Sequence, residues 1–393
     1  MTSHPTRAPA RYHAVAVALS FALAATAAAA RTTPFDHFQA DARPATLEDA
    51  YLLGLASNLA YPSKVSDREE ATPDARFRGA YAEIGLELLA IVETPPSQGQ
   101  DTQALIARTD GAVLVVFRGS ESSGVQAFID DWLLTDARIK LVPLDAVDDP
   151  TAAEPSEEEA AAELLVHRGF STALAGVYDE IREIAAAEMA SDRKLWISGH
   201  SLGGALANLL AFRLAAEGFP VQGVVTFASP RVGNDRWRDS YEKVLGRASQ
   251  QWIHDHDPVA RMPPRSQQRP YANVGRVNLI GPDHPAHLEA ELDGMGVPHP
   301  SVHPMPTYLA LMHRDLETES LIAMVPAPEP SCPTGQSVVG EHPDDGLPLC
   351  RRAMSREVTP DKCRQDGRDV VGDWCVWRVE DRYRYRAVRL KGT

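Results

Sequence analysis

Ser201 stands at the centre of a short glycine-rich stretch, Gly199–Gly203, whose residue types suit a serine nucleophile. The apolar run Leu195–Ser198 before it predicts a strand, and the Ala/Leu-rich run after it predicts a helix. On a tight strand-to-helix turn, side chains two residues before and after the serine would collide, and Gly199 and Gly203 remove them. Such a turn exposes the hydroxyl at the positive end of a helix dipole, where an oxyanion can form. A glycine-rich connection with an incidental serine is the alternative interpretation.

A serine hydroxyl needs a general base, and that base needs an orienting acid. With this kind of turn, the acid is expected to follow the serine along the chain, at the end of a later strand. Asp257 ends a predicted strand and precedes Pro258, which stops strand pairing. Asp255, two residues earlier on the same strand face, is the alternative acid.

The candidate base is His303, because it precedes two prolines and the last predicted helix of the main body, which begins near Tyr308. We expect the remaining histidines after Asp257 to lie at the surface: His284, His287, His299 and His313. His254 and His256 share a strand face and could begin a metal site, but no third ligand is in view. We therefore expect no metal and no cofactor.

Two backbone donors are candidates for holding an oxyanion. One is the N–H of Leu202, directly after the nucleophile, and the other is that of Ser120, which follows the apolar run Ala112–Phe117. The alternative for Ser120 is an ordinary turn serine.

The elements around these residues predict an α/β fold. Apolar, β-branched runs such as Ala112–Phe117 alternate with helical patterns such as Ala45–Tyr61, which predicts a mainly parallel sheet flanked by helices. A further helix is expected from Val166 to about Met189. The acidic stretch 145–163 is rich in Asp, Glu, Ala and Pro and is interpreted as a solvated loop insertion. Calcium binding is the alternative, although the stretch lacks ordered ligand spacing.

Three regions are predicted along the 393 residues. Residues 1–30 have a weakly basic start, a short apolar core and small residues, which predicts a cleaved export signal, with an uncleaved anchor as the alternative. Residues 31–325 would form the main domain, and residues 326–393 a Pro-rich linker with a small Cys-bearing extension. No later stretch is apolar enough to span a membrane, and the net charge of −15 argues against a nucleic-acid partner.

All the cysteines lie in the C-terminal extension: Cys332, Cys350, Cys363 and Cys375. An even count in an exported chain favours disulfides over zinc, because no C-x-x-C pair occurs. Proximity in sequence favours the pairing of neighbours, Cys332 with Cys350 and Cys363 with Cys375. The extension is interpreted as a structural appendage, or alternatively as a surface- or glycan-binding module using its arginines and aromatic residues.

The successive motifs resemble those of the class 3, fungal-type lipase family, which belongs to the α/β-hydrolases. In the order of that family they are VVFRGS (Val115–Ser120), DWL (Asp131–Leu133), VHRGF (Val166–Phe170), GHSLGGALA (Gly199–Ala207), FASPRVGN (Phe227–Asn234), DPVARMPP (Asp257–Pro264) and H-x-M-x-x-Y-L (His303–Leu309). The acidic stretch 145–163 and the tail after Pro326 lie outside the resemblance.

The resemblance implies that Ser201, Asp257 and His303 form a catalytic triad, with Ser120 and Leu202 as the oxyanion hole. It also implies that the segment after Ser120 is a lid. Independently, Gly124–Leu134 is amphipathic, which would suit a lipid–water interface or simply the core; its apolar face comprises Val125, Phe128, Ile129, Trp132 and Leu133.

The function expected on this basis is ester hydrolysis through an acyl-enzyme, most simply on triacylglycerols. A phospholipase A1 or a polar-ester esterase is the alternative on the same scaffold, and a non-catalytic exported binding protein is the alternative from another class.

Overall fold

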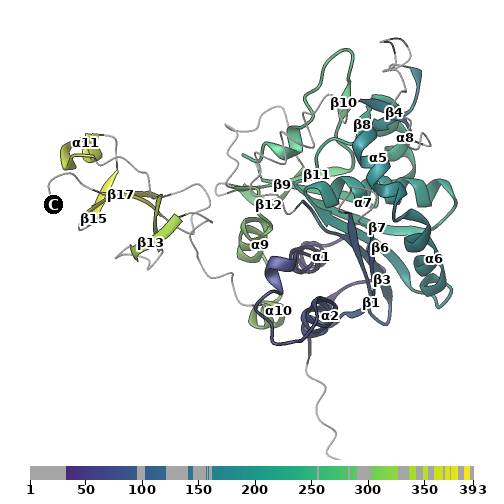
Figure 1. Cartoon of the computed structure of the whole chain (residues 1–393), viewed down its shortest axis with the longest axis horizontal. Coiled ribbons are helices and arrows are strands. Elements are labelled where there is room, and N and C mark those ends of the chain that lie inside the picture. Colours follow the sequence, from purple (N-terminus) through teal and green to yellow (C-terminus); the bar gives the residue numbers. More distant parts are fainter. Residues whose placement is uncertain are drawn as a thin grey trace, which may run out of the picture. The chain divides into compact units, whose positions relative to one another are not determined.

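A computed structural model describes residues 32–94, 102–120, 140–144, 156, 158, 162–254, 256–281, 284–289, 302–325, 336–341, 348–352, 358–365, 368–371, 373–378 and 385–389 (Figure 1). The predicted export signal, the predicted lid and most of the acidic stretch 145–163 lie outside these residues.

The helices and strands of the main body follow one another along the chain. The helices are α1 (Leu47–Leu59), α2 (Pro73–Glu83), α5 (Arg168–Ala175), α6 (Tyr178–Met189), α7 (Leu202–Ala216), α8 (Asp235–Leu245), α9 (Met305–Arg314) and α10 (Glu319–Met324). The strands are β1 (Glu87–Glu93), β2 (Gln103–Arg108), β3 (Ala112–Phe117), β4 (Leu141–Pro143), β5 (Leu165–His167), β6 (Lys194–His200), β7 (Val221–Phe227), β8 (Gly233–Asn234), β9 (Ser249–His254), β10 (Tyr271–Ala272), β11 (Arg276–Gly281) and β12 (His284–Glu289).

The main sheet has the strand order β1-β2-β3-β6-β7-β9-β11-β12 within the described part of the chain. From β3 to β11 neighbouring strands are parallel, whereas β1, β2 and β12 add antiparallel pairs at the two edges. The predicted α/β fold with a mainly parallel sheet is therefore confirmed. In the register, Phe117 lies opposite Gly199, which brings the chain after β3 beside the turn after β6.

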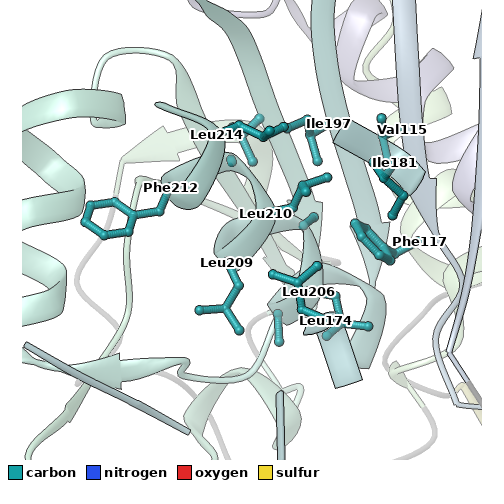
Figure 2. Packing of buried hydrophobic residues seen from close by; sticks show 14 of the residues in the cluster. Val115, Phe117, Leu174, Ile181, Ile197, Leu206, Leu209, Leu210, Phe212 and Leu214 are labelled. Carbon is teal, nitrogen blue, oxygen red and sulfur yellow. The ribbon is translucent and has the colours of Figure 1, made fainter. Parts of the chain in front are cut away.

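Helices cover both faces of this sheet and form two apolar cores (Figure 1). On one face α5, α6, α7 and α8 pack together, and on the other α1, α2, α9 and α10 do. Figure 2 shows Leu206 and Leu210 of α7 beside Phe117 of β3. Helix α7 is buried on nearly all sides, which explains why it is apolar all round rather than amphipathic. Among the described residues, no helix is both long and apolar enough to cross a membrane.

The prediction of a single helix from Val166 to about Met189 is wrong in two places. The chain first forms strand β5, which belongs to a second small sheet with the order β10-β8-β5-β4. The helical part is then divided at Gly176 and Val177 into α5 and α6. Burial of Val166 in this small sheet overrides the helical pattern of the residues that follow.

The described part of the C-terminal extension forms a sheet of its own, with the order β13-β14-β17-β16-β15. Its elements are β13 (Gln336–Glu341), β14 (Pro348–Arg352), α11 (Pro360–Gln365), β15 (Asp369–Val371), β16 (Trp374–Arg378) and β17 (Tyr385–Arg389). A disulfide joins Cys363 of α11 to Cys375 of β16, as the sequence favoured. Cys332 lies outside the described residues.

Candidate active site

Ser201 sits on a strained turn between β6 and α7. Its backbone has φ 60° and ψ −128°, a conformation that non-glycine residues adopt only when their surroundings enforce it. A Cβ atom on Gly199 would overlap the backbone oxygen of Gly203, and one on Gly203 would overlap that of Phe117. The Ser201 amide is fixed by a 2.9 Å hydrogen bond to the Phe227 carbonyl at the end of β7. The two glycines are therefore sterically required by the turn.

The side chains of Ser201, His303 and Asp257 form one hydrogen-bonded chain. His303 Nδ1 lies 2.8 Å from Asp257 Oδ2, and His303 Nε2 lies 2.9 Å from Ser201 Oγ. Because the carboxylate can only accept, Nδ1 carries the hydrogen and Nε2 is free to accept the serine proton. Ser201 comes from the turn Gly199–Gly203 between β6 and α7, which we call the elbow. Asp257 comes from the loop after β9, and His303 from the loop before α9. This arrangement can deprotonate a serine as it attacks a carbonyl carbon.

Asp257 is completely buried and is held as a carboxylate. Burial would raise its pKa, but the adjacent His303 and the hydrogen bonds to the carboxylate together lower the pKa below its ordinary value. These donors are His303, the Val259 amide at 2.9 Å and the Tyr308 hydroxyl at 2.7 Å. An ionised Asp257 orients the imidazole and stabilises it when it becomes positively charged.

Tyr308 lies in the H-x-M-x-x-Y-L motif, but no role for it follows from the sequence alone. Its hydroxyl accepts a 2.9 Å hydrogen bond from the His254 amide while donating to Asp257. Tyr308 thus ties the end of β9 to the candidate acid. The signal available in the sequence was its place in this motif, five residues after His303.

One candidate oxyanion donor, Leu202, lies within the elbow, and the other, Ser120, lies in the loop after β3. Leu202 begins α7, so its N–H is one of the amides that have no acceptor within the helix. Ser120 follows β3 through Arg118 and Gly119, and a Cβ atom on Gly119 would lie 2.7 Å from the His200 backbone oxygen. The close approach of Gly119 therefore brings the Ser120 loop against the elbow.

The alternative candidates fall elsewhere. His313 Nε2 lies 2.8 Å from the Val325 carbonyl, so this histidine joins α9 to the end of α10. His254 and His256 have ring centroids 6.0 Å apart, and no cluster of metal-ligand residues occurs within the described ranges. His284 and His287 lie on β12, whereas Asp255 and His299 lie outside the described residues. So does the predicted lid segment, which includes Val125, Phe128, Ile129, Trp132 and Leu133.

Comparison with known proteins gives sequences related to lipases and to phospholipases A1. Residues 114–267 match the family model described as lipase (class 3). A secreted mono- and diacylglycerol lipase of Fusarium solani is 41% identical over 101 residues, which are 25% of this chain and 30% of that protein. A secreted mono- and diacylglycerol lipase of Penicillium cyclopium is 29% identical over 165 residues, covering 42% and 47%. A phospholipase A1 of Oryza sativa is 28% identical over 149 residues, covering 34% of each chain.

The aligned segments thus span less than half the length of these relatives. Among solved structures, the triacylglyceride lipase of Rhizomucor miehei superposes with a TM-score of 0.49 at 22% identity, over 66% of this chain and 92% of that one. The matched segment 114–267 contains Ser120, Ser201 and Asp257, and His303 lies beyond it. Residues 114–267 of the chain are thus similar in sequence to class 3 lipases.

Proposed function

We propose that this chain is an exported serine hydrolase that cleaves carboxylic esters of lipids, with acylglycerols as the main substrates. The observation that carries the proposal is the hydrogen-bonded chain from Ser201 through His303 to the buried Asp257. The names of the Fusarium and Penicillium relatives support both export and the acylglycerol substrate.

In the first half of the reaction, Ser201 Oγ attacks the ester carbonyl carbon while its proton moves to His303 Nε2. The carbonyl oxygen becomes an oxyanion held by the amides of Leu202 and Ser120. As this intermediate collapses, the C–O bond to the alcohol breaks, and His303 gives its proton to the departing alkoxide. The acyl group remains on Ser201.

In the second half, His303 removes a proton from water as the water oxygen attacks the acyl-enzyme. The bond to Ser201 Oγ then breaks, the proton returns to the serine, and a carboxylic acid leaves. Asp257 stays ionised throughout and stabilises the imidazolium that forms in each half.

The test is hydrolysis followed by titration of released fatty acid. Tributyrin, triolein, diolein and phosphatidylcholine emulsions are compared for the wild type and Ser201→Ala. We expect the wild type to release acid from the acylglycerols and the variant to lose at least about 10³-fold in rate. Higher activity on phosphatidylcholine than on any acylglycerol would instead favour phospholipase A1, to which the Oryza relative points. Equal rates for the wild type and Ser201→Ala would contradict the proposal.

A further inference from the structure

A second histidine, His200, lies directly before Ser201 and has no part in the proposed proton transfers. Its side chain is buried, and its Nε2 lies 2.8 Å from the backbone oxygen of His303. A carbonyl oxygen only accepts, so His200 Nε2 carries the hydrogen. His200 Nδ1 lies 2.8 Å from the Tyr61 hydroxyl and must therefore accept from it. Both ring nitrogens are thus used, and one tautomer is fixed.

The contact of His200 reaches the candidate base through its main chain. The Asp257 and Ser201 contacts of His303 use only its imidazole, whose direction also depends on where the backbone lies. Pro304, the N-cap of α9, makes no side-chain capping hydrogen bond, and proline has no N–H to donate. The hydrogen bond from His200 therefore fixes the peptide from which the imidazole projects.

Tyr61 brings a third segment to the same point. It follows α1, whose last residue is Leu59, and its ring lies edge-on to that of His200 with centroids 5.9 Å apart. Its hydroxyl also packs so closely on Gly119 that a Cβ atom there would overlap it. Gly119 immediately precedes Ser120. Tyr61 therefore lies between the loop after β3, which carries Ser120, and the loop before α9, which carries His303 and is called the base loop below.

The electrostatic environment keeps His200 uncharged. Burial, and then the nearby His303, lower the pKa of His200 to about 3. The two imidazole centroids are 4.7 Å apart. At neutral pH His200 therefore adds no positive charge beside His303 when the latter accepts the serine proton, and His200 can act as a hydrogen-bond donor of constant charge.

We propose that His200 and Tyr61 are positioning residues for the reaction. Tyr61 fixes the tautomer of His200, and His200 Nε2–H holds the His303 peptide so that the imidazole stays within reach of Ser201. This inference rests on the proposed ester hydrolysis. A displacement of about 1 Å in a reacting group can cost about 10²-fold in rate, so loss of this contact should lower kcat rather than binding.

The experiment measures kcat and KM on the water-soluble ester p-nitrophenyl butyrate, together with unfolding in urea. His200→Met removes the donor at similar volume, whereas His200→Gln can place an amide N–H near the position of Nε2. We expect His200→Met to lower kcat about 10- to 100-fold with little change in KM, and His200→Gln to recover most of the loss. Tyr61→Phe should lower kcat about 3- to 10-fold.

The control is Tyr81→Phe, which removes another hydrogen-bonded tyrosine hydroxyl, 2.9 Å from the Ala56 carbonyl. Tyr81 is buried, whereas Tyr61 is half-buried. This control should reduce stability without changing kcat. Wild-type kcat in His200→Met, or equal kcat in His200→Met and His200→Gln, would overturn the inference. If His200→Met does not fold, the pair Tyr61→Phe and Tyr81→Phe decides, and equal kcat values overturn it. A wild type that does not hydrolyse the ester would instead contradict the proposed function itself.

Discussion

The elbow and the base loop hold their reactive side chains by opposite means. Ser201 is held by the shape of the backbone, with two glycines packed against carbonyl oxygens and a φ of 60° at the serine itself. His303 is held by hydrogen bonds with residues far away in the sequence. Its Nδ1–H donates to Asp257, 46 residues away, and its carbonyl oxygen accepts from His200, 103 residues away. One region leaves no room for an added atom, and the other depends on a set of donors and acceptors.

This difference predicts different responses to mutation. An extra methyl group should damage the elbow through overlap, whereas the removal of one polar atom should damage the base loop through lost orientation. In the first case stability falls most, and in the second kcat falls most.

The largest effect is expected from Gly203→Ala. The added Cβ would overlap the Phe117 carbonyl oxygen and lie 2.9 Å from that of Arg118, and backbone atoms in a buried sheet cannot move aside cheaply. We expect a loss of about 3 kcal/mol or more in the free energy of unfolding, measured in urea. In the control Gly111→Ala, the new atom would meet the Ala40 side chain at 3.2 Å, and the loss should be much smaller. Equal losses would mean that the elbow is not sterically constrained.

Tyr308→Phe should affect the base loop next most strongly. It leaves Asp257 without one donor and the His254 amide without its acceptor. We expect kcat on a soluble ester to fall about 10-fold and stability to fall by about 1–3 kcal/mol. Tyr81→Phe, matched in chemistry and burial, should lose stability alone. If Tyr308→Phe kept wild-type kcat, as Tyr81→Phe should, hydrogen bonds would not be what orients the side chains of the base loop.

A smaller effect, on stability alone, is expected from substitutions of Ser201. Ser201→Gly should relieve the positive φ and be more stable than Ser201→Ala by about 1 kcal/mol. Thermal or urea unfolding of the two inactive variants measures this directly. A glycine variant less stable than the alanine variant would show that the turn is not strained.

The smallest effect is confined to acid pH. Because the pKa of Asp257 is lower in the folded chain than in the unfolded chain, its carboxylate stabilises the fold fully above the ordinary aspartate pKa of about 3.9. That contribution is lost as the pH falls from there through the folded-state pKa. The stability difference between the wild type and Asp257→Asn should therefore shrink below about pH 4. A difference that grows in this range would contradict the assigned direction.

The same contrast explains what could be predicted from the sequence. The elbow is encoded within five residues, and the strand before it and the helix after it are both long enough to be recognised. Asp257 and His303 could be proposed from chain order and from the family resemblance, because each stands next to a proline at the end of an element.

The remaining contacts depend on tertiary structure. Tyr61 and His200 are 139 residues apart, and neither has a neighbour in the sequence that indicates the pairing. Strand β5 was missed because three residues show no period, and its partners β4 and β8 are themselves very short. Contacts between short strands or single residues that are far apart in the sequence cannot be predicted from local sequence patterns.

The most direct test of the central claim is labelling with a fluorophosphonate probe at neutral pH, followed by mass spectrometry of the labelled peptide. We expect one phosphonyl group on Ser201 in the wild type, slow or no labelling in His303→Ala, and none in Ser201→Ala. A wild type that takes no label, or a Ser201→Ala variant that is labelled equally, would contradict the claim.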